Sequence, residues 1–95
     1  MALQHRILIE KVGGTVQFNP ASLSATVGDQ IFWYNADGCD HWPVTSSSDT
    51  ALVPHTIAGT TPSDTFTSGR ATEISYFLKD DPSVTGTINV AAPPA

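Results

Sequence analysis

Charged residues are scarce in this sequence, and basic residues are the scarcest of them. Charged side chains make up 14% of the 95 residues, with 4 Lys plus Arg against 9 Asp plus Glu, so the formal net charge is −5. Nucleic-acid-binding proteins neutralise phosphates with Lys and Arg, so this composition argues against a nucleic-acid partner. An acidic balance favours solubility and basic partners. The identity of any protein partner stays open.

Cysteines and long apolar runs are also lacking. Cys39 is the only cysteine, which excludes an intrachain disulfide and leaves a monomer or a Cys39-linked dimer. The apolar runs are far shorter than a membrane-spanning helix. Charge interrupts the apolar segment Arg6–Glu10, so it does not resemble a signal peptide. The residues alone are compatible with a cytoplasmic protein or with one whose leader has been removed.

Patterns that accompany catalysis are absent from the sequence. It contains no nucleophile with a paired base, no Gly-rich phosphate loop and no pair of carboxylates with glycosidase-like spacing. We therefore expect that the chain is not an enzyme.

Short alternating segments and turn residues dominate what is present. Thr, Ser, Gly and Pro are frequent and 40% of the residues are hydrophobic, which is typical of an all-β domain. Gly13-Gly14 and Gly28-Asp29 predict turns, and residues 47–62 predict an irregular connection. The expected strands cover residues 7–12, 15–18, 23–27, 31–35, 41–46, 65–67, 73–78 and 86–90.

Seven or eight short strands at this spacing predict an antiparallel Greek-key β-sandwich. A chain of this length forms one domain, residues 1–95, with residues 1–6 and 91–95 as frayed ends. Phe18, Leu23, Ile31 and Trp33 supply its inward apolar area. Burying each large side chain contributes on the order of 1.5–3 kcal/mol. Trp33 and Tyr34 are expected on opposite faces of a strand, with Trp33 in the core.

Two extended motifs resemble those of cupredoxins, the plastocyanin-like blue copper proteins. Residues 76–90 keep the spacing of the pattern Tyr-x-Cys-x-x-His-Pro-x-Met-x-Gly-x-Ile-x-Val, with matches at Tyr76, Pro82, Gly86, Ile88 and Val90. The N-terminal half is similar to a second pattern of the family. Its matching residues are Phe18, Pro20, Leu23, Ala25, Gly28, Asp29, Ile31, Trp33, Asn35, Asp37 and His41. The resemblance covers roughly residues 7–90 and implies a cupredoxin-like sandwich.

The resemblance also identifies the positions of copper ligands. A blue copper site needs two imidazoles, a thiolate and a weak axial thioether. His41 matches the first imidazole, whereas Leu78, Asp81 and Val84 occupy the thiolate, second imidazole and thioether positions. Leu and Val have no lone pair to offer. The resemblance therefore implies a domain, natural or engineered, that has lost type 1 copper and acts as a non-redox binding or scaffold module. We expect it to have no cofactor.

Two alternatives stay open. One is a metal-binding protein with copper or zinc at an atypical site around His41, in which Cys39 and Asp81 are further ligand candidates. Residues two apart in an extended segment share a face, so Cys39 and His41 present a thiol and an imidazole together. The other is a copper-dependent electron carrier of the plastocyanin type. Against both, His41 is expected to pack beside Trp42 and Pro43, hydrogen-bonded to backbone.

Two further expectations come from the resemblance. Asn35 lies where the family uses a side-chain amide to tie the two ligand-bearing loops together. The family is periplasmic or extracellular, which favours that location for this chain, with a cytoplasmic location left open.

Overall fold

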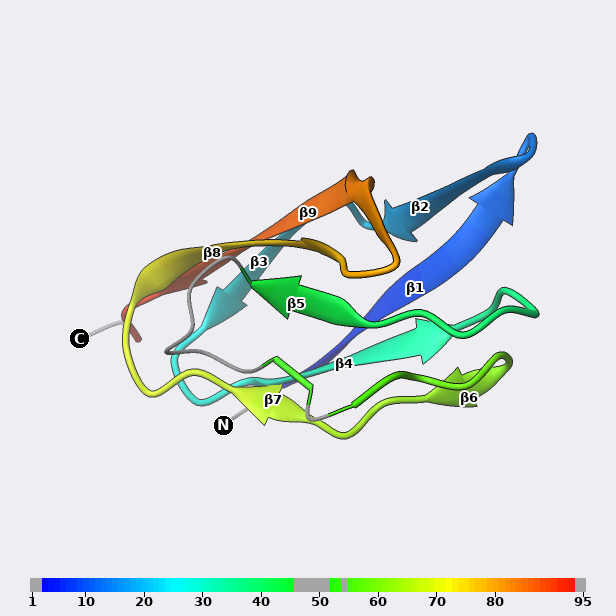
Figure 1. Cartoon of the computed structure of the whole chain (residues 1–95). Coiled ribbons are helices and arrows are strands. Elements are labelled where there is room, and N and C mark those ends of the chain that lie inside the picture. The colour runs from blue at the N-terminus through cyan, green and yellow to red at the C-terminus, as the bar shows by residue number, and fades with distance from the viewer. Residues whose placement is uncertain (1–2, 46–51, 54, 94–95) are drawn as a thin grey trace.

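The computed structural model describes residues 3–45, 52–53 and 55–93, and all the regular structure in these ranges is β-strand (Figure 1). No helix in the described part of the chain has the length and apolarity needed to cross a membrane. The strands are β1 (Gln4–Val12), β2 (Thr15–Asn19), β3 (Ser22–Thr26), β4 (Gln30–Asn35), β5 (Pro43–Thr45), β6 (Thr61–Pro62), β7 (Phe66–Thr67), β8 (Thr72–Leu78) and β9 (Asp81–Ala91).

The strands form two sheets that pack as a sandwich, which confirms the predicted fold class (Figure 1). One sheet has the order β2-β1-β4-β6, with β7 also paired to β4, and the other has the order β3-β9-β8-β5. The prediction of purely antiparallel pairing is wrong for two pairs, because β1 runs parallel to β4 and β3 parallel to β9. Alternation along a strand shows which side chains face inward, but it does not show which strand lies alongside.

The strand boundaries differ from the predicted ones in several places. Residues 4–6 and Ala91 belong to β1 and β9 rather than to frayed ends. Strand β9 begins at Asp81, five positions before residue 86, because it pairs with β8 directly after a tight turn. Part of the predicted irregular connection forms β6. Residues 46–51 and 54 of the predicted strand 41–46 and connection 47–62 lie outside the described residues.

Asp29 holds the N-terminal segment in place. Its carboxylate accepts hydrogen bonds from the backbone N–H of Leu3 at 3.0 Å and of Thr26 at 3.0 Å, and it lies 2.8 Å from His5 Nε2. The hydrogen bond with His5, followed by those from Leu3 and Thr26, lowers the pKa of Asp29 to about 2. One carboxylate in the β3–β4 turn therefore fastens the start of β1.

The core lies between the sheets and centres on aromatic residues. Along β4, the buried Ile31, Trp33 and Asn35 alternate with partly exposed residues, so Trp33 and Tyr34 do point to opposite faces. Trp33 packs edge-on against Tyr76, with ring centroids 5.4 Å apart. The hydrophobic core comprises Ile7, Ile9, Phe18, Ala25, Ile31, Trp33, Leu52, Val53, Ile57, Ile74, Tyr76, Leu78, Val84, Ile88 and Val90, with Leu23 partly buried against it.

Gly86 and Tyr76 face each other across β8 and β9. A Cβ at Gly86 would lie 2.5 Å from Tyr76 Cζ, so the tyrosine ring fills the space that a side chain would take. Burial raises the pKa of the Tyr76 hydroxyl, which keeps it protonated. Neither this hydroxyl nor Trp33 Nε1 has a hydrogen-bond partner among the described residues.

Candidate functional site

The segment between β4 and β5 carries His41 and is shaped by Asn35. Asn35 Nδ2 donates hydrogen bonds to the carbonyls of Cys39 at 2.7 Å and Ile57 at 3.0 Å, and its Oδ1 accepts from the N–H of Asp37 at 3.1 Å. His41 and Ile57 also exchange two backbone hydrogen bonds. Asn35 therefore ties the His41 segment to Ile57. The expectation that it reaches the second ligand-bearing loop is wrong, because none of these bonds goes to the β8–β9 turn.

The His41 ring is held between two carboxylates. Its Nδ1 lies 2.7 Å from Asp80 Oδ2, and its Nε2 lies 2.7 Å from Asp37 Oδ2. A carboxylate oxygen accepts hydrogen bonds, so both ring nitrogens can donate at once only when the ring is protonated. The His41 side chain is 7% exposed, so it is engaged by these side chains rather than by solvent. We call Asp37, His41 and Asp80 the carboxylate clasp.

The clasp favours the charged form of the histidine. Burial by itself lowers the pKa of His41, but the hydrogen bonds from the ring to Asp37 and Asp80, with their negative charges, outweigh burial and raise it. The hydrogen bond with His41 is also the main cause that lowers the pKa of Asp37. The contacts with Asp37 and Asp80 therefore favour the protonated form of the His41 ring.

Asp80 connects the clasp to the other sheet. It lies in the turn between β8 and β9, and its Oδ1 accepts a hydrogen bond from the N–H of Trp42 at 3.2 Å. The N–H of Lys79 in the same turn donates to the carbonyl of Trp42 at 2.8 Å. The β8–β9 turn thus lies beside the segment that enters β5 (Figure 1).

The other three positions that the sequence resemblance assigns to copper ligands lack a metal-binding arrangement. Leu78 is fully buried and pairs with Pro43, and Val84 is also part of the core. Asp81 is exposed, and its Oδ1 accepts hydrogen bonds from the hydroxyl of Ser83 at 2.7 Å and from the Ser83 N–H at 3.4 Å. The carboxylate that reaches His41 from this turn belongs to Asp80, one residue before the predicted Asp81.

Cys39 is exposed and is not drawn into the clasp. Within the described ranges, no group of three or more His, Cys, Asp or Glu residues is arranged to hold a metal ion. The sequence analysis missed Asp37 and Asp80 as partners of His41. The ring was predicted to bond to backbone groups, but its two nitrogens bond to these carboxylates instead. The signal for Asp37 was its position four residues before His41 in the family pattern.

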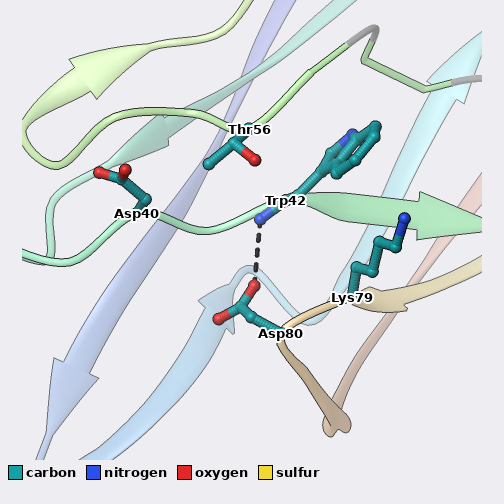
Figure 2. A pocket seen from close by; sticks show the side chains of 5 residues that line it. All are labelled: Asp40, Trp42, Thr56, Lys79 and Asp80. Atoms are coloured by element: carbon teal, nitrogen blue, oxygen red, sulfur yellow. Dashed lines mark hydrogen bonds between the residues drawn. The ribbon is translucent and has the colours of Figure 1, made fainter.

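A pocket opens beside the clasp (Figure 2). Its volume is about 390 Å³, and Asp40, Trp42, Thr56, Lys79 and Asp80 line it. Lys79 Nζ lies 4.6 Å from the centroid of the Trp42 ring, in a cation–π contact. Asp40 Oδ1 accepts a hydrogen bond from the N–H of Gly59 at 3.1 Å.

Comparison with solved structures decides the fold. The sandwich superposes on a purple cupredoxin from Nitrosopumilus maritimus with a TM-score of 0.74 and 17% identity, covering 90% of this chain and 98% of that one. Superposition on a mutant fern plastocyanin gives a TM-score of 0.75 with 13% sequence identity, and it covers 90% of this chain and 99% of the plastocyanin. Superposition on an amicyanin variant in its reduced Cu(I) form gives a TM-score of 0.73 with 17% sequence identity, and it covers 90% of this chain and 81% of the amicyanin. The chain has the cupredoxin fold.

Sequence comparison adds nothing to this likeness. No protein-family profile matches the chain, and no curated protein sequence matches it. Identities of 13–17% to the solved structures show the cupredoxin fold alone. The chemistry of the clasp and the pocket has to be argued from their own residues.

Proposed function

We propose that this cupredoxin-fold domain has lost the type 1 copper site and acts as a non-redox binding or scaffold module. The observation that carries the proposal is the state of His41, whose two ring nitrogens both face carboxylates at 2.7 Å. A metal needs a lone pair on an imidazole nitrogen. Binding here would require loss of a proton and of one charge-assisted hydrogen bond.

The apolar residues at the other ligand positions support the same proposal. Leu78 and Val84 contribute to the core, so the region next to His41 is held together by packing. Thiolate and thioether ligands would have to replace side chains that now exclude water. Because apolar packing holds this region together, its loops need no bound metal to stay in place, and this suits a scaffold.

Copper-dependent electron transfer, as in a plastocyanin, is the less supported function. An electron carrier of that type needs a thiolate at position 78, where Leu78 stands, and Cys39 lies exposed on another segment. A copper or zinc ion at an atypical site around His41 would have to compete with Asp37 and Asp80 for the ring nitrogens. We therefore expect no cofactor and no enzymatic activity.

The proposed role includes a protein partner and a location outside the cytoplasm. The net charge of −5 favours a basic partner. Solved proteins with this fold include amicyanin and plastocyanin, and by resemblance to their family we propose a periplasmic or extracellular domain. We expect a monomer under reducing conditions. Because Cys39 is exposed, oxidation can link two copies through a disulfide.

Metal analysis tests the proposal. The purified protein is analysed for bound metals and then titrated with Cu(II) and with Zn(II), with visible absorption and electron paramagnetic resonance recorded after copper addition. We expect no stoichiometric metal and no intense visible band. One equivalent of bound copper with intense absorption would overturn the proposal in favour of electron transfer. Stoichiometric binding that disappears in both His41→Gln and Cys39→Ser would favour the atypical site.

A further inference from the structure

Asp37, which holds one side of the clasp, is the only aspartate in the chain that precedes a glycine. Because glycine has no Cβ, its backbone nitrogen is the least hindered of any residue, and Gly38 is also exposed. The Gly38 N–H donates a hydrogen bond to Asp37 Oδ1 at 2.9 Å, so this nitrogen lies beside the carboxyl group of the preceding side chain. These are the two groups from which a cyclic imide forms.

We propose that Asp37 is a site of spontaneous isomerisation to isoaspartate, and that the clasp holds this modification back in the folded protein. The Gly38 nitrogen bonds to Asp37 Cγ, its proton passes to the carboxylate, and one carboxylate oxygen takes up a further proton from solvent and leaves as water. Water then adds to the main-chain carbonyl carbon of Asp37 and breaks its bond to nitrogen, with release of one proton. The main chain now runs through Cβ and Cγ, and the net reaction consumes no oxidant, reductant or cofactor.

The clasp keeps the Asp37 carboxylate in an orientation that does not allow ring closure. The hydrogen of the Gly38 N–H, rather than the face of its peptide group, points to the carboxylate. Ring closure requires the side chain to turn until Cγ lies over that face. Asp37 Oδ2 lies 2.7 Å from His41 Nε2, and Asp80 holds the other ring nitrogen, so the ring cannot follow the turn. Reaction in the folded protein therefore requires the contact between Asp37 and His41 to break.

The main chain at Asp37 is restrained as well. Its carbonyl accepts a hydrogen bond from the Thr60 N–H at 3.2 Å. A Cβ at Gly59 would lie 2.7 Å from both the carbonyl carbon and the carbonyl oxygen of Gly38, so the two segments pack backbone against backbone. Isoaspartate lengthens the main chain by one carbon and shortens the carboxylate arm by one methylene group. We therefore expect the modified residue to lose its contact with His41.

Peptide mapping of the full chain tests the proposal, with fragmentation that distinguishes isoaspartate from aspartate and detects the imide by its loss of one water. The folded protein and the protein unfolded in guanidinium chloride are incubated side by side at neutral pH. We expect Asp37 to isomerise faster than Asp40 and Asp64 in the unfolded chain, and about tenfold more slowly in the folded one. Absence of isoaspartate at Asp37 in the unfolded chain would overturn the site. Equal rates in the two states would overturn the protective role.

Two variants separate the clasp from overall stability. His41→Ala removes the ring that fixes Asp37, and we expect isoaspartate there to form about fivefold faster while circular dichroism still shows a folded domain. Gly86→Ala is the matched control, because its clash with the Tyr76 ring weakens the fold without touching the clasp. Equal acceleration in both would mean that general unfolding controls the reaction. If His41→Ala does not fold, Asp80→Asn makes the same comparison, and no acceleration relative to the control would overturn the protective role.

Gly38→Ala tests the chemical step itself. Among the described residues, no atom outside the chain neighbours lies within 4 Å of a Cβ added at Gly38, and its φ is outside the left-handed region. The variant should therefore keep the fold, while the added methyl group hinders the approach of the backbone nitrogen to Asp37 Cγ. We expect isomerisation in the unfolded chain to slow about tenfold. An unchanged rate would show that Asp37 does not react through the adjacent nitrogen.

Discussion

His41 Nδ1 lies 2.7 Å from Asp80 Oδ2, and this contact joins residues 39 positions apart in the sequence. It connects the segment after β4, in one sheet, to the β8–β9 turn of the other. Asp37 completes the carboxylate clasp from four residues before His41. The clasp therefore links two loops that a bound copper ion would hold together in a blue copper protein.

The clasp predicts a pH dependence of stability. The pKa of His41 is raised above 6.5, so its contribution is complete below pH 6.5 and is lost as the pH rises through the folded-state value. The pKa of Asp37 is lowered below 3.8, so its contribution is present above pH 3.8 and is lost as the pH falls through its folded-state value. We expect the clasp to stabilise the fold most between these limits, as measured by urea unfolding at pH 5 and pH 8.5.

The His41→Gln variant isolates the clasp from other titrating groups. Its free energy of unfolding should fall further below that of the parent chain at pH 5 than at pH 8.5. A constant difference between the two pH values would show that His41 does not change charge in this range.

The two adjacent carboxylates Asp80 and Asp81 provide a matched test. Asp80→Asn weakens the bond to His41, and because Asp80 is 41% exposed we expect a cost of only about 1 kcal/mol. Among the described residues, the Asp81 side chain bonds only to Ser83, two positions along β9, so Asp81→Asn should change stability by less than about 0.5 kcal/mol. Thermal unfolding monitored by circular dichroism compares them. The reverse order would mean that Asp81 holds the turn.

Gly86 should not tolerate a side chain. Gly86→Ala places a methyl group 2.5 Å from the Tyr76 ring, inside a packed core, and we expect a loss of roughly 1–3 kcal/mol. Gly69→Ala is the control, because no atom lies within 4 Å of its added Cβ. Chemical unfolding of both variants measures the difference. An equal cost at both positions would point to backbone entropy or turn conformation instead of the Tyr76 contact.

Rebuilding a copper site should require release of the clasp. Leu78→Cys, Asp81→His and Val84→Met restore the ligand types, but Asp80 still occupies His41 Nδ1, the nitrogen that faces the β8–β9 turn. Adding Asp80→Asn should raise copper affinity about tenfold or more, with an intense visible band. Leu78→Cys removes buried volume and costs roughly 1–3 kcal/mol in the metal-free form. Copper titration of the triple and quadruple variants measures this gain.

The single variant Leu78→Cys is the control for the rebuilt site. It should give no intense band, since Asp81 and Val84 leave the ligand set incomplete. Equal affinity of the triple and quadruple variants would show that Asp80 does not hinder the metal.

Several features follow from the sequence without its three-dimensional structure. The alternating segments predict a β-sandwich, because inward apolar residues and turn glycines leave a local pattern. Its cupredoxin-like form was implied by the resemblance of motifs that contain Phe18, Trp33, Tyr76 and Gly86. The same resemblance predicts that Leu78 and Val84 stand where the family has copper ligands, and a side chain without a lone pair cannot bind copper wherever the chain places it.

The tertiary structure decided how strands and charges meet. The parallel pairing of β1 with β4 and of β3 with β9 brings together strands that are not consecutive in the chain. The choice of Asp80 over Asp81 as the partner of His41 depends on the register of the β8–β9 hairpin. Local patterns record which side of a strand is buried, whereas a contact across 39 residues depends on where the whole fold places both side chains.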